Sequence, residues 1–72
     1  MSLKEKIEQA GNFIQDYLIK EAENYGTKNK KDISLLLYRN AYHIYPQGAQ
    51  ADKILYELIK DKEEKEIQGD IK

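Results

Sequence analysis

The stretch YRNAYHIYP, residues 38–46, holds three of the six tyrosines of the chain together with its only arginine, histidine and proline. Pro46 disfavours helical geometry in the residue before it, and the proline ring clashes with the preceding helical turn. Asp32, upstream of the stretch, is a residue type that favours the N-cap of a helix. The stretch is therefore predicted to form the C-terminal part of a helix over residues 32–45.

This central helix is apolar over most of its circumference. At 100° per residue, its side chains separate into an aliphatic stripe of Ile33, Leu36, Leu37, Ala41 and Ile44, and a tyrosine stripe of Tyr38, Tyr42 and Tyr45 with Leu35 beside them. A helix with two apolar sides must be covered on both or must leave one side for a partner. We expect the aliphatic stripe to be core. The tyrosine stripe is expected to be core or protein interface, because tyrosine combines an apolar ring with a hydrogen-bonding hydroxyl.

A first helix is predicted upstream, over residues 3–25. Ser2 and Glu5 have the spacing of a capping box, in which the serine hydroxyl accepts a hydrogen bond from a helical amide. Gly11 lies inside the helix, where it costs about 1 kcal/mol relative to alanine. Gly26 is placed to end the helix, and the polar stretch GTKNKK that it begins is expected to be a loop.

A third helix is predicted after the turn at Pro46, over residues 49–67. Asp52 lies in its first turn, where the helix dipole favours a carboxylate. The sequence DKEEKE, residues 61–66, is expected to continue the helix into solvent, supported by the i,i+4 pairs Asp61–Lys65 and Lys62–Glu66.

No alternating apolar pattern of strand length occurs, so the predicted fold is all-α. Short connections make consecutive helices antiparallel neighbours, which predicts a three-helix antiparallel bundle. Residues 1–68 are expected to form a single helical domain, and residues 69–72 a frayed C-terminal tail. A chain of 72 residues buries only about 60% of the surface that its unfolded form exposes, so oligomerisation or partner binding would add stability.

The composition narrows the classes of function. The absence of cysteine removes disulfides, thiolate metal sites and thiol catalysis, and no EF-hand loop or Glu-x-x-His motif occurs, so we expect no metal and no cofactor. The segment MSLKEKIEQ lacks the apolar run of a signal peptide, and no apolar segment approaches the roughly 20 residues of a membrane span. A cytoplasmic protein without a membrane partner is expected. The net charge of −1 produces no field that would steer the protein toward nucleic acid.

Six residues between positions 22 and 46 have a characteristic spacing: Ala22, Tyr25, Ser34, Tyr38, Ala41 and Pro46. This spacing resembles the tetratricopeptide helical hairpin over residues 15–48, with Leu18 at its large apolar position and Glu21 where that family has leucine. The resemblance implies a protein-binding scaffold, whose last helix would correspond to a solvating cap. The predicted architecture is also similar to the MIT domain, a three-helix bundle whose grooves accept short amphipathic peptides.

Arg39 and His43 lie one turn apart and share the narrow polar sector of the central helix. A histidine can act as a general acid or base beside a cation that stabilises a phosphate-like transition state. The segment resembles the Arg-x4–6-His motif of the helical nucleases called HEPN domains, although it is one residue short. The alternative function that this implies is a HEPN-type ribonuclease or a toxin–antitoxin component.

Lys28, Lys30 and Lys31 form a basic group in the polar loop. They are able to contact the phosphates of RNA or DNA, which makes a weak nucleic-acid binder a second alternative. No arginine or aromatic residue is interleaved with them, so a solvated turn is the preferred interpretation.

The preferred function is a small helical protein–protein interaction module without enzymatic activity. It is expected to act by self-association, as a homodimer, or by docking onto a larger partner as an adaptor or regulator. No small-molecule substrate is indicated. The expected contact residues belong to the tyrosine stripe and the polar sector beside it: Leu35, Tyr38, Arg39, Tyr42, His43 and Tyr45.

Overall fold

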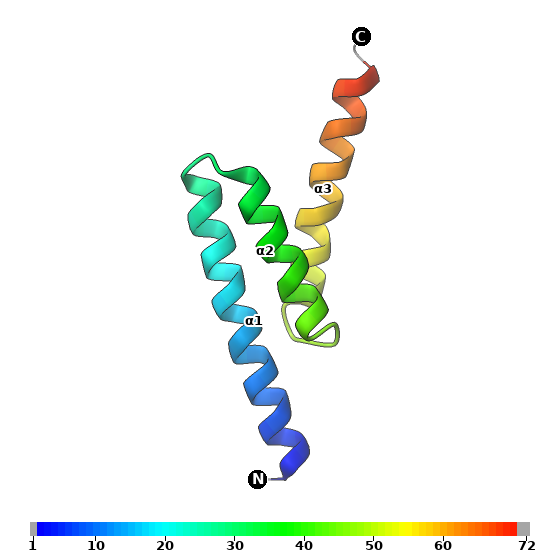
Figure 1. The fold of residues 1–72 in the computed structure, drawn as a ribbon. Coiled ribbons are helices and arrows are strands. Elements are labelled where there is room, and N and C mark those ends of the chain that lie inside the picture. Colours follow the sequence, from blue (N-terminus) through cyan, green and yellow to red (C-terminus); the bar gives the residue numbers. More distant parts are fainter. Residues whose placement is uncertain (1, 71–72) are drawn as a thin grey trace.

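The computed structural model describes residues 2–70 of the chain and the side chains of residues 2–63. Its helices are α1 (Leu3–Thr27), α2 (Lys31–Ile44) and α3 (Ala51–Asp70). Each helix runs antiparallel to the next, and α2 lies between the other two (Figure 1). Residues 2–70 contain no strand. The predicted all-α fold with three antiparallel helices is confirmed.

α1 begins as predicted and ends later than predicted. The amide of Glu5 donates to the hydroxyl oxygen of Ser2 at 3.2 Å, so Ser2 is the N-cap. Gly26 does not end the helix, which continues to Thr27. The left-handed residue in the connection is Asn29, with φ of 61°. Asparagine tolerates this conformation better than other residues that carry a side chain, so the chain reverses here rather than at the glycine.

α2 and α3 begin at residues other than those predicted. Lys30, not Asp32, is the N-cap of α2, and Asp32 lies in the first helical turn instead. α2 ends at Ile44, before Pro46, as the proline predicts. α3 starts two residues later than expected, at Ala51, and extends to Asp70, three residues beyond the predicted end.

The three helices form an open bundle, arranged as a shallow layer. The molecule measures 56 × 22 × 13 Å along its principal axes, whereas a single helix with its side chains is already about 10–12 Å across. α2 packs more extensively on α1 than on α3, and α3 tilts away from the hairpin toward its C-terminal end (Figure 1). Such a layer can cover only one side of its central helix.

The core lies on the tyrosine side of α2. Half-buried leucines and Tyr42 pack around a buried cluster with members from all three helices. The buried members are Ile19, Ala22, Tyr38, Ala41 and Ile54. The prediction that the aliphatic stripe is core is confirmed for Ala41, which is fully buried, and for Leu37, which packs against the core. It was wrong for Ile33, Leu36 and Ile44, which are exposed. The reason is the size of the residues on the other side. Small side chains there let α1 and α2 approach closely, and the ring of Tyr38 fills the space that remains.

Polar contacts fix the same interface. The hydroxyl of Ser34 donates to the carbonyl of Ala22 at 2.6 Å. Gln15 is fully buried, and its amide nitrogen donates to the carbonyls of Ala41 and Tyr45 at 3.0 and 2.9 Å. Its amide oxygen accepts from the backbone of the loop before α3, at 3.3 Å. One side chain of α1 thus ties the end of α2 to the start of α3.

Two glycines permit this close packing. A Cβ on Gly11 would lie 2.9–3.1 Å from ring atoms of Tyr45. A Cβ on Gly48 would collide with the amide oxygen of Gln15 and approach the same ring. The helix propensity lost at Gly11 is therefore the cost of seating Tyr45 against α1.

Candidate functional site

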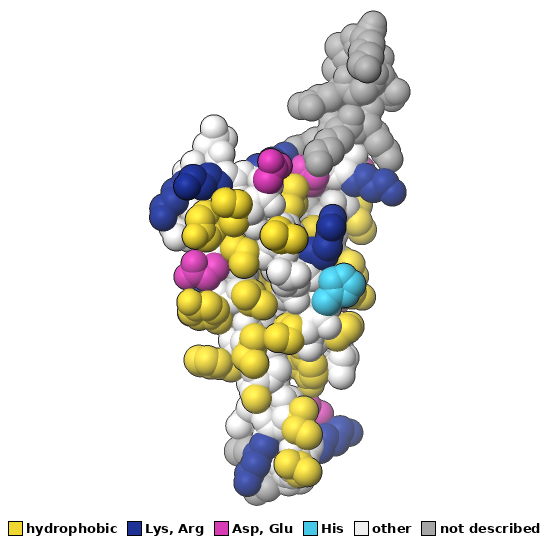
Figure 2. Space-filling model, in the orientation of Figure 1, with side chains coloured by type: hydrophobic (Ala, Val, Ile, Leu, Met, Phe, Trp, Pro, Cys, Tyr) yellow, Lys and Arg dark blue, Asp and Glu magenta, His cyan; other side chains and the backbone are white. Residues whose placement is uncertain are grey.

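The first candidate surface is an apolar face on the side of α1 and α2 that is open to solvent. Figure 2 shows hydrophobic side chains spread over both helices on this side, with an acidic side chain among them. We define the apolar face as the large hydrophobic side chains of α1 and α2 that are between 41% and 60% exposed: Ile7, Ile14, Tyr17, Ile33, Leu36 and Ile44. None of them is charged, and Glu21, one turn after Tyr17, is half-buried.

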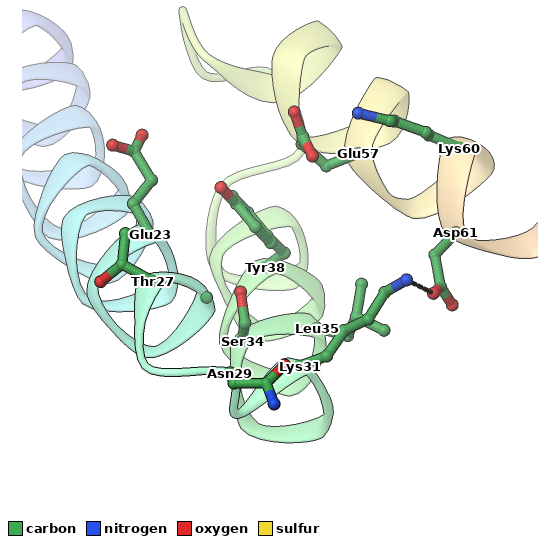
Figure 3. Close-up of a pocket in the computed structure, with 11 residues that line it drawn as sticks. Glu23, Thr27, Asn29, Lys31, Ser34, Leu35, Tyr38, Glu57, Lys60 and Asp61 are labelled. Atoms are coloured by element: carbon green, nitrogen blue, oxygen red, sulfur yellow. Dashed lines mark ion pairs between the residues drawn. The ribbon is translucent and has the colours of Figure 1, made fainter. Parts of the chain in front are cut away.

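The second candidate surface is a groove of about 550 Å³ between the C-terminal half of α1 and α3, with α2 as its floor (Figure 3). Glu23 lines it from α1 and Glu57 from α3, on opposite sides of Tyr38. Ser34 and Leu35 complete the floor. Carboxylates on two walls and a phenol between them make the centre of the groove a place for hydrogen-bond donors.

Tyr38 connects the core to this groove. Its side chain is only 6% exposed, yet its hydroxyl points into the groove (Figure 3). No hydrogen bond from the described residues reaches that hydroxyl. Burial raises the pKa of Tyr38 above its usual value, and the negative charges of Glu57 and Glu23 raise it further. The phenol is therefore held neutral in a negative local potential.

Ion pairs lie beside the groove. Lys31, at the start of α2, pairs with the buried carboxylate of Asp61 on α3 at 3.0 Å. This contact replaces the solvated role predicted for Asp61; the predicted pairs with Lys65 and Glu66 involve side chains outside the described residues. Lys53 on α3 pairs with Glu23 on α1 at 3.1 Å, and both side chains are about half exposed. Both pairs tether α3 to the hairpin.

The six residues predicted to bind a partner differ in how far they are exposed. Tyr38 is in the core, and Leu35, Tyr42 and Tyr45 are half-buried within the chain. Arg39 and His43 are exposed. The rings of Tyr42 and His43 meet edge to face, with centroids 6.1 Å apart. The tyrosine stripe is thus largely covered by the protein itself.

The three loop lysines are exposed, but two of them have contacts within the chain. The ammonium of Lys28 lies 5.6 Å from the centre of the Tyr25 ring, and Lys31 pairs with Asp61. Lys30 is the N-cap of α2.

Sequence reasoning did not single out Glu23 and Glu57. The sequence did contain a pattern that indicates where these two glutamates lie. Three small residues of α1, together with Gln15, lie along one line of the helix surface: Gly11, Ala22 and Gly26. That line marks the contact with α2, and Glu23 follows directly beside it. Glu57 comes three residues after the buried Ile54, so it borders the buried stripe of α3.

Comparison with known proteins found no matching family model, no similar curated protein and no similar solved structure. Among the described residues, no helix is long and apolar enough to cross a membrane.

Proposed function

We propose that this chain is a small protein–protein interaction module that pairs with a second copy of itself through the apolar face. The observation that carries the proposal is the face itself, which places six large apolar side chains, each about half exposed, on two adjacent helices. Monomeric soluble proteins rarely leave a contiguous apolar surface of this kind uncovered.

The size of the face supports pairing. Half-exposed side chains of this size offer roughly 100 Å² each, so the six together offer on the order of 600 Å². A standard interface buries about 800 Å² of each partner. The flanking residues Leu3 and Phe13, each 74% exposed, extend the available area.

The shape of the fold favours a second copy as the occupant. A shallow three-helix layer lacks a second layer over α1 and α2, and another antiparallel hairpin has the matching shape. The six side chains of the apolar face are uncharged, so like-charge repulsion between two identical faces would come only from neighbouring residues such as the half-buried Glu21. This proposal replaces the tyrosine stripe with the apolar face as the principal contact surface.

The local packing also supports a tetratricopeptide-like hairpin. Four residues at the small and aromatic positions of that pattern are buried, and the fifth, Tyr25, is half-buried. The four buried residues are Ala22, Ser34, Tyr38 and Ala41. We place the module in the cytoplasm, since a cysteine-free chain suits a reducing compartment. Docking onto a larger partner is the alternative mode of action, and no enzymatic role is proposed.

Sedimentation equilibrium of three proteins tests the pairing. Ile44→Lys places a charge in the apolar face, and Ile59→Lys places the same charge on α3, where isoleucine is similarly exposed (50% and 54%). A lysine at the C-terminal end of α2 suits the helix dipole, so the first variant should remain folded. We expect the wild type and Ile59→Lys to dimerise at micromolar concentration and Ile44→Lys to be monomeric. A wild-type monomer up to submillimolar concentration would rule out self-association.

A further inference from the structure

The groove between α1 and α3 has the features of a binding site for a cation. Three oxygen-bearing groups from three different helices surround its centre: the carboxylates of Glu23 and Glu57 and the hydroxyl of Tyr38 (Figure 3). Its volume of about 550 Å³ is within the usual range of about 300–1,000 Å³ for ligand pockets. The groove opens on a different side of α2 from the apolar face.

Tyr38 supplies an observation independent of the acidic residues. More than nine-tenths of its side chain is buried, and the hydroxyl is nevertheless directed into the groove without a hydrogen-bond partner among the described residues. The oxygen itself is open to the groove, since it is not among the buried polar atoms that lack a hydrogen bond. A ligand group that enters the groove can therefore hydrogen-bond to the phenol in place of water.

The charges around the hydroxyl define the sign of that ligand group. Glu57 forms no ion pair with a described residue, and Glu23 has only the half-exposed Lys53 as its partner. Lys31 is paired with Asp61, so its charge is already compensated. Lys60 also lines the α3 wall, but it is exposed to solvent. Both glutamates make the potential at the phenol negative, which favours a cationic donor.

We propose that the groove binds the guanidinium group of an arginine presented by a protein partner, with Tyr38 accepting a hydrogen bond at the floor and Glu23 and Glu57 flanking the charge. A guanidinium is planar and carries five N–H donors that point in several directions, so acceptors on three helices can share it. An ammonium is more strongly hydrated and is the poorer fit to a partly buried site. Binding would also bridge α1 and α3, which have few contacts of their own.

NMR titration of the ¹⁵N-labelled protein with a blocked Gly-Arg-Gly peptide tests this site. The matched ligand is the same peptide with citrulline, which has nearly the same shape and no charge. We expect the arginine peptide to shift amides near Glu23, Tyr38 and Glu57, and to bind about tenfold more tightly than the citrulline peptide, as one charge-assisted hydrogen bond requires. Equal binding of the two peptides would overturn the proposal.

Protein variants locate the site. Glu57→Gln and Tyr38→Phe should each weaken binding of the arginine peptide about tenfold. Glu63→Gln, at an exposed position of α3 outside the groove, should leave it unchanged. Circular dichroism checks that each variant is folded. The site is wrong if Glu57→Gln and Glu63→Gln behave alike.

Two further measurements test whether the cation comes from a protein and whether the site is independent of dimerisation. Free arginine adds an α-carboxylate and an α-ammonium whose charges cancel, so it should bind no more tightly than the blocked peptide. Tighter binding of the free amino acid would overturn a protein source. The monomeric Ile44→Lys variant should bind the arginine peptide as the wild type does, because its substitution lies on the apolar face. This result is independent of whether the chain dimerises.

Discussion

The two sides of α2 differ in what covers them. The side with Ser34, Tyr38 and Ala41 lies against α1 and is closed by Ile54 of α3. The other side, with Leu36 and its aliphatic neighbours, is open to solvent. Hydrophobicity alone predicts the opposite, with Leu36 and its aliphatic neighbours buried. The comparison shows that close approach and satisfied hydrogen bonds decide which side of a helix is buried, since the covered side has the smaller residues and the polar ties of Ser34 and Gln15.

The largest expected effect contrasts Tyr38 with Leu36. Tyr38→Ala removes a large ring from the core and should lower the free energy of unfolding by about 3–5 kcal/mol. Leu36→Ala should cost less than about 1 kcal/mol, because its side chain is already 54% exposed. Urea denaturation followed by circular dichroism measures both.

Leu36→Ala should be measured in protein that also carries Ile44→Lys, because dimerisation then no longer contributes to stability. Similar losses for the two alanine variants in that background would contradict the assignment of the core to the tyrosine side.

A medium effect is expected from the glycines of α1. Replacing glycine with alanine inside a helix usually stabilises it by about 1 kcal/mol. Gly26→Ala should do so, because its Cβ would lie 3.5 Å from the Ser34 hydroxyl, an ordinary contact. Gly11→Ala should instead destabilise the protein by about 1–2 kcal/mol, because the ring of Tyr45 must move. Thermal and urea unfolding should show opposite changes in stability for these two variants.

A double variant sharpens this test. When Tyr45→Ala removes the ring, Gly11→Ala should become stabilising, as it is at Gly26. If Gly11→Ala remains equally unfavourable without the ring, contact with Tyr45 is not the reason for glycine at that position.

The smallest expected effect is the pH dependence from Tyr38. Its pKa is raised in the folded state by burial and then by Glu57 and Glu23. The unfolded chain therefore loses the proton first, near pH 10. The contribution of the neutral phenol to stability is complete below that pH and is lost as the pH rises through the folded-state pKa.

Urea denaturation at neutral and alkaline pH measures this loss. Stability should fall less between the two pH values for Tyr38→Phe than for the wild type. Tyr56→Phe is the control, since Tyr56 is 65% exposed and lies on α3, outside the apolar face. An identical pH dependence of the wild type and Tyr38→Phe would mean that the phenol is not in a perturbed environment.

Much of the fold could be predicted from local sequence. The capping role of Ser2 and the end of α2 before Pro46 followed from short-range chemistry, and both were confirmed. Gly26 and Asp32 were wrong as helix boundaries because several neighbouring residues in the loop could serve equally well. The candidate site was harder to predict, since Glu23 and Glu57 are far apart in the sequence and face each other only across the groove.

The sequence by itself determined three helices, their approximate lengths and their antiparallel order, because periodicity, caps and short connections act over a few residues. The tertiary structure alone decided which side of α2 is buried. That choice depends on how closely α1 and α2 can approach, and hence on Gly11, Ala22 and Ala41 matching across two helices. It also depends on Gln15 reaching carbonyl groups that only the folded chain brings within hydrogen-bonding distance.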